Sequence, residues 1–245
     1  MIFDFHTHNE GAVSAQIADT LMRQADGFMT LGDVFAFGKN PDADSVRKIN
    51  DMSYQYAGAA PGKRHAACYI NPANDLESCI EEMRLRIVKQ GFRAVKFEVD
   101  LICTDPAMTP IMEEIARLNV PAVHHCWRKT TKRYPGESLP EDIARLAARH
   151  PDVKIVMAHL SNCGYQGIAQ AARLPNIYVD TSGGLPEGSV LEYALSLLGA
   201  ERILFGSDIP YRNPASQLGR VLGCLRSRKQ RELILYQNAE RLLGL

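Results

Sequence analysis

The sequence predicts an α/β protein, a single (β/α)8 or TIM barrel that extends over residues 1–245. Two observations predict it. Short apolar segments alternate with amphipathic helical segments along the chain, and there are eight such apolar segments. Such alternation indicates right-handed βαβ units and a parallel sheet. A doubly wound open sheet is the alternative, but no G-x-G-x-x-G pattern follows the first apolar segment to favour it.

The expected strands are short, and several are apolar on both faces, as strands inside a barrel should be. Examples are the runs PAV, IVMA and ILF. The eight expected strands lie at residues 2–8, 27–36, 65–71, 91–98, 120–126, 154–160, 176–182 and 202–208.

Helical periodicity and capping residues place amphipathic helices between these strands. In one of them the apolar residues recur at helical spacing and Gly91 follows the end, and another starts behind Asp105 as a candidate N-cap. The expected helices lie at residues 14–25, 74–90, 106–119, 138–150, 187–198, 214–226 and 230–243.

The composition argues against several classes of function. Lys plus Arg equals Asp plus Glu at 28 each, and no basic stripe is visible, so we expect no nucleic-acid partner. The six cysteines contain no C-x-x-C pair, which favours reduced thiols over a disulfide framework or a zinc finger. No apolar segment reaches the roughly 18 residues of a membrane span, and no leader is visible. We therefore expect a cytoplasmic protein without a membrane partner.

Histidines gather at the ends of the expected strands, where a (β/α)8 barrel carries its active site. His6 and His8 end the first strand and, being two residues apart, share one face of it. His159 ends the sixth strand and Asp208 the eighth. Imidazole nitrogens and a carboxylate oxygen are the donors that zinc uses when one position stays open for water. We expect a divalent ion here, zinc first, with manganese and iron as alternatives.

The fifth strand ends in two adjacent histidines, His124 and His125. Because successive side chains of a strand point to opposite faces, only one of them can point into the barrel. The spacing of the run favours His125 as the ligand. His124 is the alternative. Whichever of the two is not the ligand faces the surrounding helices or donates a hydrogen bond that supports the ligands.

Asp208 is a candidate for two roles. A bound divalent ion lowers the pKa of its water from 15.7 to about 7. A neighbouring carboxylate then accepts the proton as the water attacks and returns it to the leaving group. Asp208 is therefore the expected general acid/base as well as a weak metal ligand.

Lys96 and Glu98 lie on one face near the end of the fourth strand. Lys96 has three open roles: an ion pair with Glu98, binding of a substrate carboxylate, or carboxylation into a bridge between two metal ions. The choice between one ion and two depends on it, and the sequence leaves both open.

Four residues behind the strand ends are candidates for substrate binding. Arg128 could clamp a carboxylate with two hydrogen bonds, or lie exposed in its basic loop. Trp127, the only tryptophan, could wall the pocket or cap the barrel, and Tyr211 could donate to an oxyanion. Asn162 follows the ligand candidate of the sixth strand.

The sequence resembles the amidohydrolase superfamily, in particular its amidohydrolase-related branch, which includes decarboxylases and hydratases similar to aminocarboxymuconate-semialdehyde decarboxylase. The resemblance is carried, in family order over nearly the whole chain, by FHTH, GFRAVKFE, VPAVHH, IVMAHLS, NIYVDTSG, ILFGSDIPY and NAERLLGL. It implies a TIM barrel of the metal-dependent hydrolase type. The metal ligands that it implies are His6, His8, His125, His159 and Asp208.

We therefore expect a metal-dependent hydrolase that uses an activated water on a small amide, lactone or other carbonyl substrate. The first alternative is a metal-dependent non-oxidative decarboxylase of a small unsaturated or aromatic acid, in which Asp208 protonates carbon. The second alternative is a non-catalytic metal-binding barrel. The expected partner is a small molecule, and a homodimer is the expectation from base rates alone.

Overall fold

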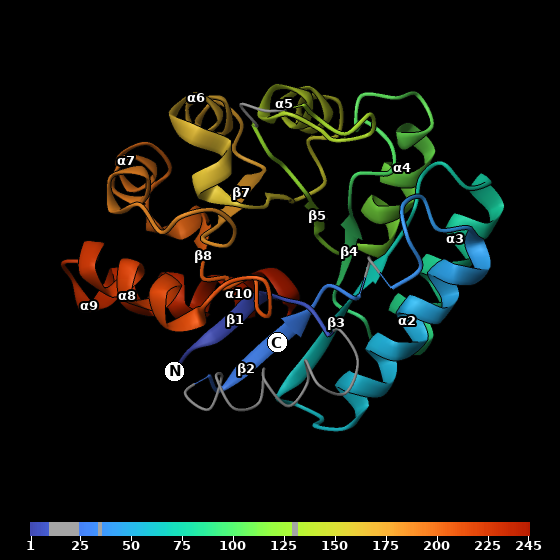
Figure 1. Ribbon diagram of the computed structural model, residues 1–245, viewed down its shortest axis with the longest axis horizontal. Coiled ribbons are helices and arrows are strands. Elements are labelled where there is room, and N and C mark those ends of the chain that lie inside the picture. The colour runs from blue at the N-terminus through green and yellow to red at the C-terminus, as the bar shows by residue number, and fades with distance from the viewer. Residues whose placement is uncertain (10–24, 34–35, 129–131) are drawn as a thin grey trace.

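The computed structural model describes four stretches of the chain, residues 1–9, 25–33, 36–128 and 132–245. Eight parallel strands form one sheet in chain order, and helices occupy the connections between them (Figure 1). The strands are β1 (Phe3–Thr7), β2 (Gly27–Thr30), β3 (Arg64–Tyr69), β4 (Ala94–Phe97), β5 (Ala122–His124), β6 (Ile155–Met157), β7 (Ile177–Asp180) and β8 (Ile203–Leu204).

The last strand returns to the first. The N–H of Phe5 donates to the carbonyl of Phe205 at 2.9 Å, and Thr7 pairs with Ile209 in a parallel bridge beyond β8. The sheet is therefore a nearly closed barrel, and the predicted (β/α)8 fold is confirmed. All eight expected strands are present, each shorter than its apolar segment, because the polar residues at the carboxyl ends leave the ladder for the βα loops.

The helices cover the outside of the barrel. None of those within the described residues combines the length and the apolarity that crossing a lipid bilayer demands. They are α2 (Ala43–Gly58), α3 (Leu76–Arg84) with a π-helical continuation (Leu85–Lys89), α4 (Met108–Leu118), α5 (Pro140–Arg149), α6 (Leu160–Ala172), α7 (Gly188–Leu198), α8 (Pro214–Cys224), α9 (Arg228–Glu232) and α10 (Asn238–Leu243).

Two of these helices, α2 and α6, are not among the expected ones. The inward face of α2 includes the polar residues Asn50 and Ser53, both fully buried, which weaken its hydrophobic pattern. Within α6, Gly164 has φ 65° and ψ 176° and interrupts the helix near its start. The expected helix at residues 14–25 lies outside the described residues, apart from its last position.

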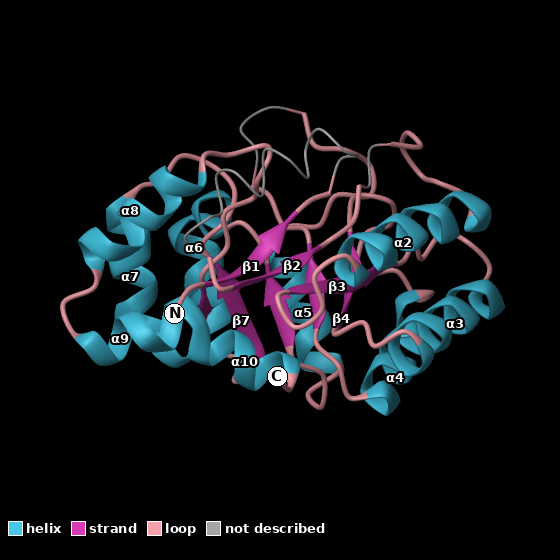
Figure 2. Cartoon of the chain, turned by 90° about the horizontal axis from the view of Figure 1, so that it is seen from below, coloured by secondary structure: helices cyan, strands magenta, loops and turns pink. Residues whose placement is uncertain are grey.

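Apolar side chains pack in two layers, one on each side of the sheet. The barrel interior contains Phe5, Met29 and Val156, and Leu243 of α10 packs against them from one end. The outer layer lies between the sheet and the helices. Burial of each large aliphatic side chain stabilises the fold by about 1.5–3 kcal/mol. Figure 2 shows α10 and the C-terminus at one end of the barrel and loops crowded at the other.

Candidate metal centre

His6 and His8 enter the barrel from the end of β1. The pairing of β1 with β2 changes register between Asp4 and Thr7, and such an irregularity redirects side chains. His6 consequently faces the interior although its neighbour Phe5 also packs there. The Nε2 atoms of His6 and His8 are 3.3 Å apart, and both rings are buried. The two nitrogens thus face one small volume, side by side as the His-x-His spacing predicts.

Asp208, which follows β8, lies against both imidazoles. Its Oδ1 is 3.6 Å from His6 Nε2 and 3.4 Å from His8 Nε2. His159, which follows β6, brings a third imidazole, with Nε2 3.9 Å from Oδ2 of Asp208. One donor atom from each of His6, His159 and Asp208 lies within 4.8 Å of the other two. Atoms so placed could hold a single metal ion.

The ring nitrogens of His159 fit a bound cation. Both are buried, and neither has a hydrogen-bond partner among the described residues. An unpartnered buried polar atom is costly, and coordination to an ion would remove that cost. Burial, opposed only in part by the Asp208 carboxylate, holds the pKa of His159 well below its ordinary value. The ring is therefore neutral and has a lone pair to offer.

Hydrogen bonds orient the rings of His6 and His8 through their Nδ1 atoms, which face away from Asp208. His6 Nδ1 donates to Oδ2 of Asp180, at the end of β7, at 2.8 Å, and His8 Nδ1 donates to the carbonyl of Gly32 at 2.9 Å. These bonds leave both Nε2 lone pairs directed at Asp208. Burial alone would raise the pKa of Asp180, but the charge and hydrogen bond of His6 keep it well below its ordinary value. Asp180 is not among the predicted site residues, although it lies two positions before the end of the seventh expected strand.

His159 and Asp208 both have left-handed backbone conformations, with φ 68° and φ 67°. A residue other than glycine in this region costs about 1–3 kcal/mol. Hydrogen bonds fix the conformation: Asp208 N–H donates to the carbonyl of His6 at 2.8 Å, and His159 N–H donates to Asp180 Oδ1 at 3.1 Å. Gly183 leaves the necessary room, since a Cβ there would lie 2.6 Å from Cβ of His159.

Of the two adjacent histidines, His125 lines the cavity beside the donors and His124 does not. His124 Nδ1 donates to the carbonyl of His125 at 2.8 Å, and its ring lies against that of Phe97 in the layer outside the sheet. Burial lowers the pKa of His124 to about 4, so that ring is neutral behind the site.

His125 has a carboxylate at each ring nitrogen. Its Nδ1 is 3.4 Å from Oε2 of Glu98, and its Nε2 is 3.1 Å from Oε1 of Glu137. The ring centroids of His125 and His159 are 4.8 Å apart, yet His125 does not belong to the close group of donor atoms. The structure thus groups His6, His159 and Asp208 most closely, places His8 against His6 and Asp208, and leaves His125 beside them. Glu137, which is fully buried, comes from an irregular segment and is another residue that the sequence did not single out.

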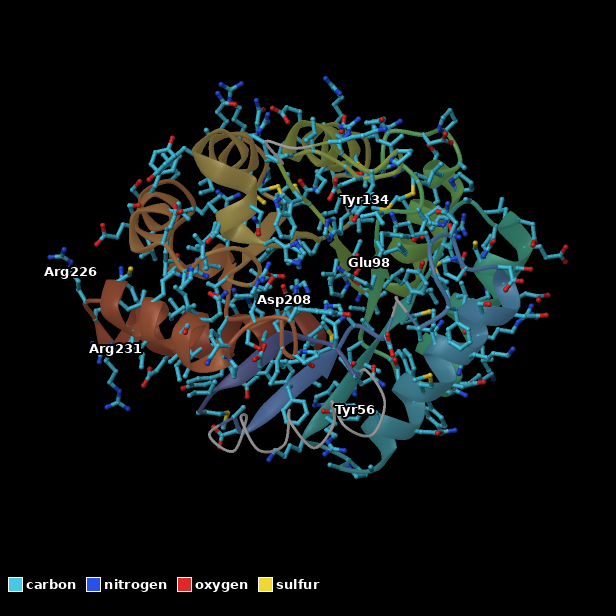
Figure 3. All side chains as sticks on the ribbon, viewed as in Figure 1. Tyr56, Glu98, Tyr134, Asp208, Arg226 and Arg231 are labelled. Atoms are coloured by element: carbon cyan, nitrogen blue, oxygen red, sulfur yellow. The ribbon has the colours of Figure 1, made fainter. Side chains whose placement is uncertain are left out.

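Lys96 is fully buried, and its Nζ lies 2.9 Å from Oε1 of Glu98. Burial would raise the pKa of Glu98, but the charges of Lys96 and His125 outweigh it and lower this pKa to about 2. Of the three roles open to Lys96, the geometry favours the ion pair. Figure 3 places Glu98 and Asp208 inside the ring of helices, near the middle of the view.

The donors open into a cavity of about 290 Å3. The ring of Tyr211 lies edge-on to that of His8, with 5.1 Å between the ring centroids. The ring of Trp127 stacks on that of His125, with 6.1 Å between the centroids. The cavity is lined by His8, Glu98, His125, Trp127, His159, Asp208, Tyr211 and Arg212. Trp127 and Tyr211 therefore lie where the sequence predicts substrate contacts.

A second cavity, of about 400 Å3, is also lined by Trp127 and Arg212, so the two adjoin. Asn162 lines this second cavity. Arg128 lines neither, and its guanidinium forms an ion pair with Glu141 of α5. Arg212 lines the site instead; it follows Tyr211 in the sequence but is not among the predicted substrate-binding residues.

A model of the amidohydrolase family matches residues 4–245 of the chain, which confirms the resemblance seen in the sequence. No protein of curated function matches the sequence.

Solved structures of similar fold include two decarboxylases. A 2,6-dihydroxybenzoate decarboxylase complexed with 2,6-dihydroxybenzoate is 17% identical, with a TM-score of 0.79 over 100% of this chain and 99% of the other. A dihydroxybenzoic acid decarboxylase from Polaromonas sp. JS666, with bound manganese and the inhibitor 2-nitroresorcinol, is 16% identical, with a TM-score of 0.78 over 100% and 97%. A third structure, 4-oxalomesaconate hydratase from Rhodopseudomonas palustris, is 15% identical, with a TM-score of 0.72 over 100% and 96%. At these identities the likeness shows the shared fold.

Proposed function

The chain belongs to the amidohydrolase family of metal-dependent enzymes, and we propose that it is a hydrolase acting on a small carbonyl compound with one divalent ion. The observation that carries the proposal is the close approach of donor atoms from three strand ends, together with the buried, unpartnered ring nitrogens of His159. The proposed metal ligands are His6, His8, His159 and Asp208.

When bound, the ion would supply a positive charge that polarises the substrate carbonyl and acidifies water. The role of Asp208 is to move protons. Burial would raise its pKa, but the nearby imidazoles of His8, His159 and His6 keep this pKa well below its ordinary value. The ionised carboxylate accepts a proton from the attacking water and returns it to the leaving group.

The remaining wall residues bind substrate and exclude water. Trp127 supplies an apolar surface beside His125, and Tyr211 is placed to donate a hydrogen bond to a developing oxyanion. Arg212 gives the cavity a positive charge suited to a carboxylate on the substrate. Asn162 contacts the part of the substrate that extends into the second cavity.

One ion per chain is proposed because the Lys96 ammonium lies 2.9 Å from Oε1 of Glu98, which favours an ion pair over carboxylation into a bridge. Three imidazoles and a carboxylate are donors typical of zinc, which we propose first. Manganese is the alternative, supported by the manganese bound in the similar decarboxylase from Polaromonas. His125 is the candidate for a fifth ligand, which would require its Nε2 to leave Glu137 or its Nδ1 to leave Glu98.

Decarboxylation of a small aromatic or unsaturated acid is the second candidate. It is supported by the two similar structures that are decarboxylases of hydroxylated benzoic acids, and by the position of Arg212 at the cavity. In that reaction the proton carried by Asp208 would go to the carbon that loses CO2.

The experiment combines metal content with the Asp208→Asn variant. Inductively coupled plasma mass spectrometry on protein purified without added metal or affinity tag should find about one ion per chain. Because Asn tolerates a left-handed backbone, the variant should keep its melting temperature while turnover falls by about 10²–10⁴. Lactones and amides in a pH-stat, and aromatic acids in a CO2-release assay, separate hydrolysis from decarboxylation.

The matched control for this variant is Asp105→Asn, which lies ahead of α4 and away from the site. Undiminished turnover in Asp208→Asn contradicts the assigned role. Absence of turnover on every substrate class in the metal-loaded parent would favour the non-catalytic barrel instead. Absence of metal after reconstitution with zinc, manganese and iron contradicts the metal centre itself.

The six free cysteines, five of them buried, support a reducing compartment such as the cytoplasm. We propose a small-molecule substrate without a nucleic-acid partner, in keeping with a formal net charge of zero. A single domain over residues 1–245 and a homodimer both stay predictions.

A further inference from the structure

A cavity of about 610 Å3 lies at the end of the barrel opposite the metal centre. Its walls come from the segments that enter β4, β5 and β6, from Tyr178 near the start of β7, and from the end of α10. Arg93 and Lys154, which line it, each precede a residue of the metal cavity, Glu98 and His159, by five positions. Five residues of extended strand span roughly 16 Å, so the two cavities are separate.

This second-end cavity carries an excess of positive charge. It is lined by Arg93, Lys154 and Arg241, against the single carboxylate of Asp152. Among the described residues, no ion pair joins a carboxylate to any of these three cations. Within the described part of the chain, Arg241 donates to the carbonyl of Glu201 and to the amide oxygen of its helix neighbour Asn238, and to no carboxylate.

The surroundings of Arg93 are the strongest indication that the cavity binds an anion. Its Nε is buried and has no hydrogen-bond partner among the described residues. The pKa of the neighbouring His65 is lowered, by burial first and then by the charge of Arg93. Over the residues that the structure describes, the buried N–H of this guanidinium lacks an acceptor, and no carboxylate offsets its charge. A bound anion would supply both the hydrogen-bond acceptor and the negative charge.

Apolar residues form the rest of the wall. Phe92, Ile115, Leu118 and Leu242 lie beside the cations, with the ring of Tyr178. The volume falls within the range of roughly 300–1,000 Å3 that is usual for small-molecule sites. We propose that this cavity binds a small organic polyanion, with an apolar body against these residues and its negative groups on Arg93, Lys154 and Arg241. Its occupant is a ligand other than the substrate, since the metal centre lies at the opposite end.

Isothermal titration calorimetry of the metal-loaded protein with benzene-1,3,5-tricarboxylate tests the proposal. The probe combines an apolar ring with three carboxylates. Lys154→Gln changes an exposed side chain, and Arg93→Gln adds the half-buried one, with thermal melts to verify folding. Lys229→Gln, on the exposed side of α9, is the matched control for loss of charge, and Arg212→Gln controls for binding at the metal cavity.

We expect saturable binding that weakens roughly tenfold in Lys154→Gln and further in the double variant with Arg93→Gln. The Lys229→Gln and Arg212→Gln proteins should bind as the parent does. The proposal is overturned by an absence of saturable binding at millimolar probe. It is equally overturned by an unchanged affinity in the folded double variant, or by an affinity that falls only in Arg212→Gln.

Discussion

Oδ2 of Asp180 lies 2.8 Å from Nδ1 of His6, and neither side chain is exposed to solvent. This carboxylate fixes the ring so that Nε2 faces Asp208, although Asp180 itself does not reach the donor cluster. Asp180→Asn keeps the size of the side chain but removes its charge. We expect metal affinity to fall by about 10–100-fold, the usual cost of losing such an outer partner.

Competition with a fluorescent chelator measures that affinity. Asp105→Asn, with its carboxylate at a helix start away from the site, should bind metal as the parent does. If Asp180→Asn binds metal as tightly as the parent, the orienting role is wrong. A melting curve verifies that the variant is folded before its affinity is interpreted.

His125 provides a test of which histidines bind the ion. Because both of its nitrogens face carboxylates, we expect His125→Asn to retain about one ion per chain while turnover falls by about 10²-fold or more. His159→Asn, by contrast, should lose the metal. Metal content by mass spectrometry separates the two, and loss of metal from His125→Asn would assign that residue as a ligand instead.

Arg212 and Arg128 form a matched pair for substrate binding. Arg212 lines both cavities near the metal donors, whereas Arg128 is paired with Glu141. For an anionic substrate we expect Arg212→Gln to raise KM by roughly 10–100-fold, the value of a charged hydrogen bond. Arg128→Gln should change KM by less than about threefold. Steady-state kinetics on both variants decides, and the reverse order of effects would restore Arg128 as the clamp.

Asp100 should make the stability of the fold depend on pH. Burial and the charge of Glu98 raise its pKa to about 6, against a donated hydrogen bond from Tyr69 at 2.7 Å. A folded-state pKa above the ordinary value of 3.8 means that this group stabilises the fold fully below about pH 4. That contribution is lost as pH rises through about 6.

The variant Asp100→Asn mimics the protonated acid and still accepts a hydrogen bond. We therefore expect its melting temperature to match that of the parent near pH 4 and to exceed it near pH 7. Glu77→Gln, an exposed change on α3, should follow the parent at both values. An equal pH dependence in Asp100→Asn and the parent would rule out this linkage.

The donor cluster was predictable because two regularities fix it. Parallel strands of a barrel end on the same side, and residues two apart on a strand share a face. These rules alone place His6, His8, His159 and Asp208 together. The register change in β1, between Asp4 and Thr7, was not predictable from these rules, and it contributes to the inward direction of His6.

The loop residues were not predictable in the same way. The direction of Arg128 depends on Glu141, which lies thirteen positions later on another element. The environment of His125 depends on Glu137, from a segment without regular structure. No periodicity relates such pairs, so their contacts follow only from the folded chain. Helix α2 was not predicted for a related reason. Its buried Asn50 donates hydrogen bonds to Tyr69 and Glu82, which belong to other elements.

The left-handed backbone at Asp208 sets activity against thermostability. Glycine adopts a positive φ without strain, so a chain with glycine at this position would escape a cost of about 1–3 kcal/mol. It would also lose the carboxylate. Laboratory selection for heat resistance alone should therefore drift toward inactive barrels, and a design that aims at a more robust enzyme must hold residues 159 and 208 constant.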